Sequence, residues 1–247
     1  MFEKKYELRY FEMNQYGEAS PVTILTLLEE AAADHCFSIA YSLYDLMKQD
    51  IGWILLGGYL RMERYPSYKE NVTIRTWMSN YSTIRGIREN IIFDEQDNII
   101  GQAKGLWLFF DIKRRRPVKI FEDIKKKWSY FAEESVKNDI RKKIEPIYSA
   151  KYSNRFQVHR FDIDTNKHVN NIRYLQWLLE SLPTEIIDNY FLHIIDGRFT
   201  SEAQYEHIVS SLTKNDNIDN TFIHTIKDLR TEKVCVAAKS KWKRRML

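Results

Sequence analysis

The chain has 247 residues, of which 44% are hydrophobic and 14% aromatic, with only eight glycines and five prolines. This composition excludes a disordered or fibrous protein and indicates a compact globular one, with one large domain or two smaller ones. The net charge is +4, but 34 acidic residues accompany the 38 basic ones. Because no regular series of aromatic residues separates the basic clusters, nucleic acid is not the expected ligand.

Four runs of basic residues stand out along the chain. They lie at residues 113–116, 125–127, 141–143 and 239–245. Runs of this kind are compatible with an acidic partner, such as an acidic protein or a phosphorylated carrier, but ordinary solvated faces are the more frequent explanation.

Neither a membrane span nor a secretion signal is apparent. No segment reaches the roughly 18 uninterrupted apolar residues of a span, and the first residues, MFEKKY, lack the apolar core of a signal peptide. We therefore expect a cytoplasmic protein. Cys36 and Cys235 lie among apolar residues, and two cysteines in a chain of this length form no disulfide framework, which predicts two buried thiols.

The first half of the chain is predicted to begin with a strand around Tyr6–Glu12. A helix follows from Pro21, which is a favourable residue at a helix start. Nearly every side of this helix is apolar or small, so we expect it to be buried on several faces. A short helix near residues 41–47 comes next. Four strands are then predicted, at about residues 52–64, 71–81, 84–94 and 99–111.

A charge-rich and weakly periodic stretch, residues 121–154, separates the two halves and is expected to be a linker with one or two short helices. The second half is predicted to contain a helix over Asn170–Leu182, which Pro183 stops. Four strands follow, at about residues 192–203, 208–214, 221–229 and 234–242.

The two halves share a pattern at an offset of 150 residues, which relates Tyr6–Glu12 to Phe156–Asp162. The offset also matches apolar residues of the two helices: Val22 with Ile172, Leu25 with Leu175, and Leu28 with Leu178. Such self-similarity predicts a duplicated unit of strand, buried helix and antiparallel meander. We therefore expect an α+β protein with domains at residues 1–120 and 155–247, each a sheet wrapped around a central helix. Apolar grooves in such units would suit a long apolar ligand.

A polar segment directly before the second helix is the candidate active site. Asp164, Asn166 and His168 stand at alternate positions, and Asn170 and Asn171 follow. Groups able to transfer a proton, next to helix N-terminal amides that can polarise a carbonyl, commonly carry out acyl transfer or hydrolysis. A purely structural role for Asp164, Asn166 and Asn170 as cap and turn residues is the alternative, although a cap needs only one such residue.

The same segment does not predict a metal site. Its alternating oxygen-bearing side chains have the spacing of a calcium loop, but Lys167 stands where that loop needs glycine and Arg173 where it needs the closing glutamate. Zinc is disfavoured because His168 is the single soft ligand in the segment. We therefore expect neither a metal nor another cofactor.

The segment and several other stretches resemble one protein family. Asp164–Asn171, which reads DTNKHVNN, with Tyr174 and Trp177 after it, is similar to the signature of acyl-acyl carrier protein thioesterases of the bacterial and plant plastid type. The similarity continues at residues 64–66, 72–77, 88–90, 105–107 and 114–117. It therefore covers nearly the whole chain.

The resemblance implies two tandem hotdog domains, in agreement with the duplicated unit. It also implies hydrolysis of the thioester between a fatty acyl chain and the phosphopantetheine arm of acyl carrier protein, which is the expected partner. Free fatty acid and holo-acyl carrier protein are the products. The family's catalytic positions correspond to Asp164, Asn166, His168 and Glu202, with Glu202 on the first long strand of the second half.

One position departs from the plant relatives, which commonly have a cysteine directly after this glutamate, whereas here the residue is Ala203. A thiol nucleophile is thus excluded at this position, and activated water is the expected attacking group. We expect Glu202 to act as the general base or, alternatively, as a direct nucleophile. Asn166 and His168 would orient water and substrate, and Asp164 would hold one of them by a hydrogen bond. Backbone amides of residues 169–171 would stabilise the oxyanion.

The first half contains an equivalent of the signature, Asn14–Ser20, which lacks the histidine. The first domain is therefore expected to be non-catalytic, and the resemblance implies that it houses the acyl tail and sets the chain-length preference.

Trp53, Asn170 and Asn171 are the candidate substrate-binding residues. Asp162 is a rival to Asp164, but Glu12 at the equivalent place of the first half indicates a repeated structural position.

Three other functions stay open at this point. The chain could hydrolyse acyl-CoA, bind acyl groups without catalysis, or dehydrate a hydroxyacyl thioester. Binding alone would require none of the polar candidates, which favours hydrolysis. The preferred acyl length, the tolerance of unsaturation and homodimerisation are not determined by the sequence.

Overall fold

The computed structural model describes residues 1–128, 130–165 and 168–245. Two compact units make up the chain: unit 1 comprises Met1–Leu56 and Leu60–Ile140, and unit 2 comprises Gly57–Tyr59 and Arg141–Leu247. Residues 121–140, predicted to belong to the linker, thus group with unit 1, and residues 141–154 group with unit 2.

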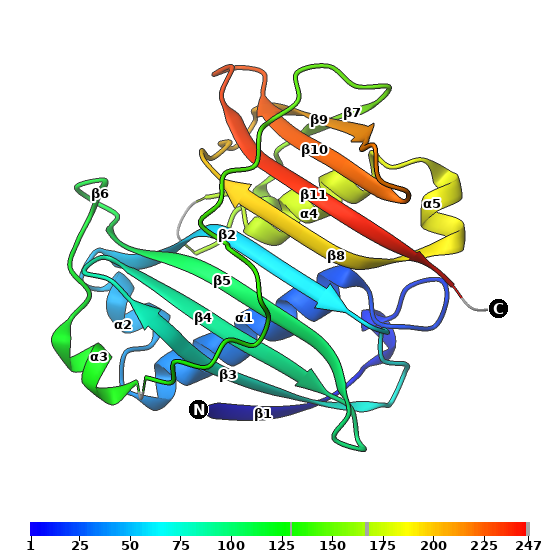
Figure 1. Cartoon of the computed structure of the whole chain (residues 1–247). Coiled ribbons are helices and arrows are strands. Elements are labelled where there is room, and N and C mark those ends of the chain that lie inside the picture. The colour runs from blue at the N-terminus through cyan, green and yellow to red at the C-terminus, as the bar shows by residue number, and fades with distance from the viewer. Residues whose placement is uncertain (129, 166–167, 246–247) are drawn as a thin grey trace. The chain divides into compact units, whose positions relative to one another are not determined.

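Unit 1 follows the predicted order of elements (Figure 1), but the strand predicted around Tyr6–Glu12 lies earlier, at Phe2–Glu7, and Tyr10–Glu12 form a 3-10 helix. It contains β1 (Phe2–Glu7), the short 3-10 helix η1 (Tyr10–Glu12), α1 (Pro21–Ser38), α2 (Leu43–Met47), β2 (Ile51–Met62), β3 (Asn71–Tyr81), β4 (Arg85–Phe93), β5 (Ile99–Asp111), β6 (Arg116–Pro117) and α3 (Glu122–Lys127). Its sheet has the order β1-β3-β4-β5-β2, with β6 paired to β5. The pairs β1–β3, β3–β4 and β4–β5 are antiparallel.

Helix α1 packs against β1 and β3. Its start is fixed by Ser20, whose side chain accepts a hydrogen bond from the Thr23 amide, and by Pro21 in the first turn. The helix buries residues on several sides, as predicted: Thr23, Ile24, Leu27, Leu28, Ala31, His35 and Cys36. The sheet and this helix therefore form the helix-on-sheet unit expected for a hotdog domain.

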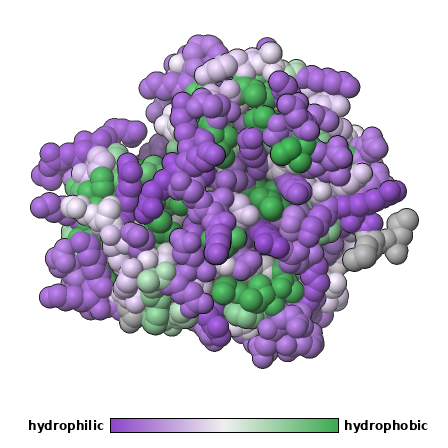
Figure 2. All heavy atoms as spheres, viewed as in Figure 1, coloured by the Kyte–Doolittle hydropathy of each residue, from purple (hydrophilic) through white to green (hydrophobic). Residues whose placement is uncertain are grey.

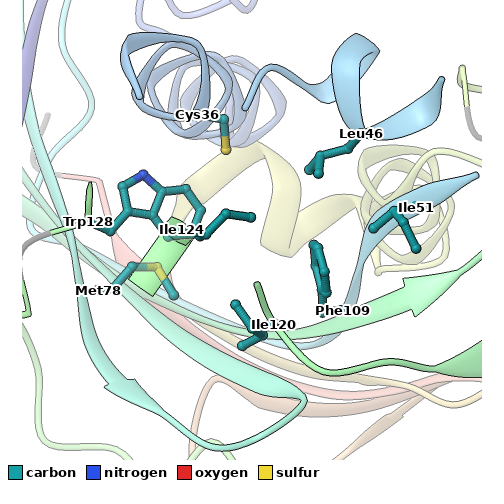
Figure 3. Packing of buried hydrophobic residues seen from close by; sticks show 8 residues of the cluster. All are labelled: Cys36, Leu46, Ile51, Met78, Phe109, Ile120, Ile124 and Trp128. Carbon is teal, nitrogen blue, oxygen red and sulfur yellow. The ribbon is translucent and has the colours of Figure 1, made fainter. Parts of the chain in front are cut away.

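A hydrophobic cluster fills one end of unit 1, where α1, α2, α3 and the sheet meet (Figure 3). Its labelled side chains point toward one another: Cys36, Leu46, Ile51, Met78, Phe109, Ile120, Ile124 and Trp128. Trp128, which directly follows α3, is 2% exposed and brings the end of α3 into the core. The segment after β5 therefore belongs to the core of unit 1 and does not act only as a connection.

Beyond Trp128, residues 130–140 lie along the sheet of unit 1. Tyr130 forms an isolated parallel bridge with Met78, and the Trp77 side chain donates to the Glu133 carbonyl. Val136 and Ile140 are buried. Backbone pairing and apolar burial thus hold this segment against β3 and its neighbours.

Unit 2 repeats the strand–helix–meander order (Figure 1). It contains β7 (Tyr152–Gln157), the 3-10 helix η2 (Arg160–Asp162), α4 (Asn171–Leu179), α5 (Thr184–Asn189), β8 (Tyr190–Phe199), β9 (Ile208–Asn215), β10 (Thr221–Asp228) and β11 (Val234–Arg244). Its sheet has the order β8-β11-β10-β9-β7, and each neighbouring pair is antiparallel. Helix α4 packs against β9 and β10.

The predicted offset of 150 residues is seen directly in the first part of each unit. It relates β1 to β7, η1 to η2, and the first residue of α1 to that of α4. Even an isolated bridge is repeated, since Met13 pairs with Ala19 and Ile163 with Val169. The duplicated unit is therefore confirmed through the start of the central helix, and the later strands follow with other spacings.

Two predicted boundaries in unit 2 were wrong. The helix predicted to Leu182 ends at Leu179, and Pro183 precedes a separate short helix, α5. A residue before proline is disfavoured in the helical conformation, which explains the break. The strand predicted to Ala203 ends at Phe199, because the Thr200 and Ser201 hydroxyls donate to the Val234 carbonyl. Glu202 therefore lies in a loop after β8.

Hydrophilic residues cover most of the face shown in Figure 2, and hydrophobic residues appear on it in small separate groups. Two phenylalanines are nearly fully exposed at equivalent places of the repeat, Phe11 at 95% and Phe161 at 92%. Both cysteines are free and buried, as predicted. Among the described residues, no helix is long and apolar enough to cross a membrane.

Candidate active site

The polar segment before α4 forms a closed turn in unit 2. The Asp164 amide donates to the His168 carbonyl at 2.8 Å, and the His168 amide donates to Asp164 Oδ1 at 3.3 Å. The flanking residues Ile163 and Val169 form an antiparallel bridge. Asp164 therefore shapes the turn that presents His168. Asn166, the third candidate of this segment, lies outside the described residues.

The start of α4 uses Asn170 as its cap. Asn170 Oδ1 accepts a hydrogen bond from the Ile172 amide at 2.8 Å, which confirms the capping interpretation for this residue. The Asn170 amide itself donates to the Asp162 carbonyl at 2.8 Å. That amide is therefore already used and does not serve the oxyanion, contrary to the expectation for residues 169–171. Asn171 is the first residue of the helix.

His168 and Glu202, which are 34 residues apart in the sequence, meet in the structure. His168 Nε2 lies 3.2 Å from Glu202 Oε2, and the two side chains are 20% and 30% exposed. This exposure leaves both groups accessible to water and to a substrate carbonyl. A charge-assisted hydrogen bond forms when the imidazole is protonated, and its energy is limited because both groups remain in contact with solvent.

The loop between β8 and β9 carries Glu202. Its first residues are tied to the start of β11, because the Thr200 amide donates to the Cys235 carbonyl at 2.9 Å and the Ser201 hydroxyl to the Val234 carbonyl at 2.7 Å. The Ala203 amide donates to the Tyr174 hydroxyl at 2.9 Å. Glu202 thus stands on a backbone with fixed partners on both sides.

Asp162, the rival acid, has structural partners. Its Oδ2 accepts the His159 amide at 2.8 Å, and its Oδ1 lies 3.3 Å from Arg173 Nε. Glu12, its counterpart in unit 1, accepts the Arg9 amide at 2.6 Å in the same kind of turn. The repeat therefore explains Asp162 as a residue that closes the short 3-10 helix.

The equivalent turn in unit 1 has the same backbone but different chemistry. The Asn14 amide donates to the Glu18 carbonyl at 2.8 Å, which matches the bond between Asp164 and His168. Glu18 stands at the position of His168, and Ser20 stands at the position of the cap residue Asn170. Unit 1 thus lacks the imidazole in this turn, as the sequence indicated.

Trp53, the candidate residue in unit 1, lies on β2 beside the hydrophobic cluster of that unit. Its ring centroid is 4.7 Å from that of Phe109 and 5.9 Å from that of Trp128. Its indole nitrogen is buried without a hydrogen-bond partner among the described residues, as is the hydroxyl of Tyr81. The neighbouring Arg88 guanidinium lies over the Trp128 ring at 5.1 Å. The surroundings of Trp53 are therefore mainly aromatic and aliphatic, with a few polar groups.

Sequence reasoning missed a second pair of histidine and acid in unit 2. His207 Nδ1 lies 2.7 Å from Asp228 Oδ2, with the side chains 6% and 1% exposed. No sequence motif links these residues, which come together only because the loop after β8 returns beside the end of β10. Unlike the pair of His168 and Glu202, this pair is shielded from solvent, which favours a structural role. Among residues 1–128, 130–165 and 168–245, no group of three or more His, Cys, Asp or Glu side chains converges as metal ligands would.

Comparison with known proteins identifies the family. The model of the acyl-ACP thioesterase N-terminal domain matches residues 1–128, and that of the acyl-ACP thioesterase C-terminal domain matches residues 146–244. An oleoyl-acyl carrier protein thioesterase of Coriandrum sativum, described as chloroplastic, is 27% identical over 241 residues, which are 91% of this chain and 65% of that protein. Oleoyl-acyl carrier protein thioesterase 1 of Arabidopsis thaliana, also chloroplastic, is 28% identical, over 86% of this chain and 63% of that protein. This chain thus spans less than two thirds of the length of these relatives.

Solved structures show the same fold. The 12:0-ACP thioesterase of Umbellularia californica has a TM-score of 0.88 at 20% identity, over 99% of this chain and 97% of that one. An acyl-ACP thioesterase of Bacteroides thetaiotaomicron has a TM-score of 0.86 at 18% identity, over 98% of this chain and 97% of that one. The predicted α+β tandem hotdog fold is therefore confirmed. With one family model matching each half, the chain belongs to the acyl-ACP thioesterase family.

Proposed function

We propose that this protein hydrolyses the thioester of fatty acyl-acyl carrier protein, releasing a free fatty acid and holo-acyl carrier protein. The observation that carries the proposal is the contact of 3.2 Å between His168 Nε2 and Glu202 Oε2. It joins the two parts of the candidate site in one unit of the fold, and both side chains remain accessible. Membership of the family supports the choice of substrate.

The chemistry follows from the groups present. Glu202 acts as a general base and takes a proton from water, whose oxygen then attacks the thioester carbonyl carbon. His168 orients the carboxylate and the water, and Asp164 holds His168 in place through the turn. The tetrahedral intermediate collapses with cleavage of the carbon–sulfur bond. The leaving thiolate recovers the proton, so that acid and thiol are formed from thioester and water.

The positive end of α4 supports the charge that develops on the carbonyl oxygen. Helix N-terminal amides and the helix dipole stabilise anions close to the first turn. The Asn170 amide is excluded from this role because it donates to Asp162. We expect the backbone amide of Asn171, the first residue of α4, to donate to the carbonyl oxygen instead.

We assign the acyl tail to unit 1. Trp53 and the cluster around Trp128 give this unit an apolar and aromatic interior, and its signature-like turn lacks the histidine. Apolar and aromatic side chains that converge in one interior suit an alkyl chain. A larger side chain at Ile51 or Ile124 in this cluster is expected to shift the preference toward shorter chains.

The basic runs at residues 113–116 and 125–127 supply the charge for an acidic carrier protein. Electrostatic attraction of this kind accelerates association and weakens as salt screens it. Hydrolysis of acyl carrier protein thioesters is therefore expected to slow as ionic strength rises, mainly through KM. The two thioesters are compared at low and at moderate salt. An acyl-CoA thioesterase would hydrolyse acyl-CoA at least as efficiently as acyl-acyl carrier protein under both conditions.

The test is release of free thiol from a panel of acyl-acyl carrier proteins of different chain length. Glu202→Gln and His168→Ala are each expected to lower kcat by at least about 100-fold, the scale of a lost acid–base group. Glu206→Gln is the matched control, since Glu206 is an exposed acid of the same loop. Wild-type rates in folded Glu202→Gln protein would refute the assignment. Absence of release from every thioester would refute the enzyme and favour a binding protein.

Intact mass spectrometry separates the two roles of Glu202. A direct nucleophile would form an acyl-enzyme adduct, visible after rapid acid quench of a single turnover. Water activation predicts no adduct at any chain length.

A further inference from the structure

Tyr174 connects the helix that follows the His168 turn with the loop that carries Glu202. Its side chain belongs to the first turns of α4 and is almost completely buried, at 2% exposure. The hydroxyl accepts a hydrogen bond of 2.9 Å from the amide of Ala203, the residue directly after Glu202. The catalytic acid is therefore one peptide unit away from a group anchored on α4.

The same hydroxyl has a second partner, the thiol of Cys235. Ser201, on the other side of Glu202, also contacts Cys235, with 3.7 Å between Oγ and Sγ. Burial raises the pKa of both the Tyr174 hydroxyl and the Cys235 thiol, so both stay protonated. Tyr174 can thus donate to sulfur while it accepts from the Ala203 amide.

The far end of the Glu202 loop is fixed independently. His207 is paired with Asp228 at 2.7 Å, and its amide donates to the Gln204 carbonyl at 3.0 Å. The loop is therefore held at residues 200–201 by β11 and at His207 by β10. Between these anchors, the Glu206 amide donates to the Val158 carbonyl at 3.1 Å, and the Ala203 amide, next to Glu202, donates to the Tyr174 hydroxyl.

We propose that Tyr174 is a positioning residue for the reaction. Its hydroxyl fixes the backbone after Glu202, and so keeps the carboxylate within 3.2 Å of His168 Nε2. His168 and Tyr174 lie on either side of the helix cap Asn170, so a single short, hydrogen-bonded segment carries both. The bond between the Tyr174 hydroxyl and the Ala203 amide then adjusts the distance between Glu202 and His168 within a loop whose two ends are already anchored. This inference rests on the proposed function of Glu202.

The effect of losing this bond follows from burial. Without the tyrosine oxygen, the Ala203 amide would be left without an acceptor in a buried place, and the loop would shift to satisfy it. A displacement of about 1 Å at a catalytic group can lower the rate by about 100-fold. Substrate binding in unit 1 is not expected to change.

The test is Tyr174→Phe, which removes one oxygen and keeps the packed ring. We expect kcat to fall by about 10- to 100-fold while KM stays within about twofold. Thr225→Val is the matched control, because Thr225 is also buried in unit 2 and its hydroxyl also accepts a backbone amide, that of Ile147 at 2.8 Å. The control is expected to lose a similar amount of thermal stability and to keep its kcat.

A double-variant cycle distinguishes positioning from general destabilisation. In a Glu202→Gln background, Tyr174→Phe is expected to have almost no further effect on kcat, because the group that it positions is already gone. An equal fold-loss in both backgrounds, or an unchanged kcat in Tyr174→Phe, would overturn the inference. Wild-type activity of Glu202→Gln would instead refute the proposed function itself.

Cys235→Ala provides an independent variant if Tyr174→Phe is too unstable to purify. It removes the second partner of the hydroxyl and leaves the ring in place. We expect kcat to fall by about two- to fivefold with KM unchanged, and this loss to disappear in the Glu202→Gln background. A kcat equal to that of the wild type would count against the positioning role.

Discussion

Replacement of Glu89 on β4 is expected to lower the free energy of unfolding more than any other substitution that we propose. Its side chain is fully buried, and Oε1 lies 3.5 Å from Lys104 Nζ, which is itself 1% exposed. The carboxylate also accepts the Ser79 hydroxyl at 2.8 Å, and the Ser135 amide and hydroxyl at 3.0 and 2.7 Å. It therefore joins three strands, β3, β4 and β5, to the segment after Trp128.

The size of the effect follows from these distances. Two unit charges 3.5 Å apart attract each other by about 5 kcal/mol at an effective dielectric constant of about 20. Removal of one member of a buried pair costs about 3–5 kcal/mol. Without Glu89, the buried Lys104 ammonium would keep its contacts with the exposed Glu134 and with the Asn138 carbonyl, but Ser79 would lose its acceptor. We expect Glu89→Ala to lower the free energy of unfolding by at least about 3 kcal/mol. This is a large part of the roughly 5–15 kcal/mol that stabilises most domains.

Urea unfolding followed by circular dichroism measures this loss. Glu134→Ala is the matched control: Glu134 also contacts Lys104, at 3.2 Å, but is 55% exposed, so its loss should cost less than about 1 kcal/mol. Glu89→Leu combined with Lys104→Met should recover much of the stability that Glu89→Leu alone loses. A loss in Glu89→Ala no greater than that in Glu134→Ala would refute the reasoning.

Two further predictions concern other sites. Burial opposes ionisation of Asp94, but hydrogen bonds from Asn98, Arg64 and Gln96 outweigh it and lower the pKa to about 2; the stability that the ionised carboxylate contributes is present above its unfolded pKa near 4 and is lost as the pH falls toward 2. Acid titration of unfolding should therefore show a smaller loss between pH 4 and pH 2 in Asp94→Asn than in the wild type, and identical curves would contradict this. Ser20→Ala and Asn170→Ala should each cost about 1 kcal/mol as helix caps. Only Asn170→Ala should also lower kcat, because its helix starts beside the His168 turn, and equal kcat values would argue against that link.

The sequence predicted the long strands of unit 1 to within a few residues, and Asn71–Tyr81 and Ile99–Asp111 match β3 and β5 at both ends. Strong apolar alternation and clear turn residues make such strands locally determined. The helix starts were also predictable, since Pro21 and Asn170 mark them by their own conformational preferences.

The errors fall where a local pattern competes with a tertiary contact. The strand predicted to Ala203 keeps a strand-like sequence, yet the hydroxyls of Thr200 and Ser201 take up the Val234 carbonyl and end the ladder at Phe199. The sequence after β5 resembles a charged linker, because its few apolar residues show neither the spacing of a helix nor the alternation of a strand. Trp128, Val136 and Ile140 are nonetheless buried. Periodicity cannot reveal such isolated anchors.

By itself the sequence determined the duplicated α+β architecture, the family and the two halves of the candidate site, because each depends on patterns or motifs that are local in the chain. The tertiary structure decided what those motifs can do together. It places His168 next to Glu202. It also sets two hydrogen bonds, from the Asn170 amide to the Asp162 carbonyl and from the Ala203 amide to the Tyr174 hydroxyl. The tertiary structure also brings His207 and Asp228 together as a buried pair, which no sequence motif predicts. These contacts join residues that are far apart along the chain, and their geometry is fixed only when the loop after β8 packs against α4 and β11.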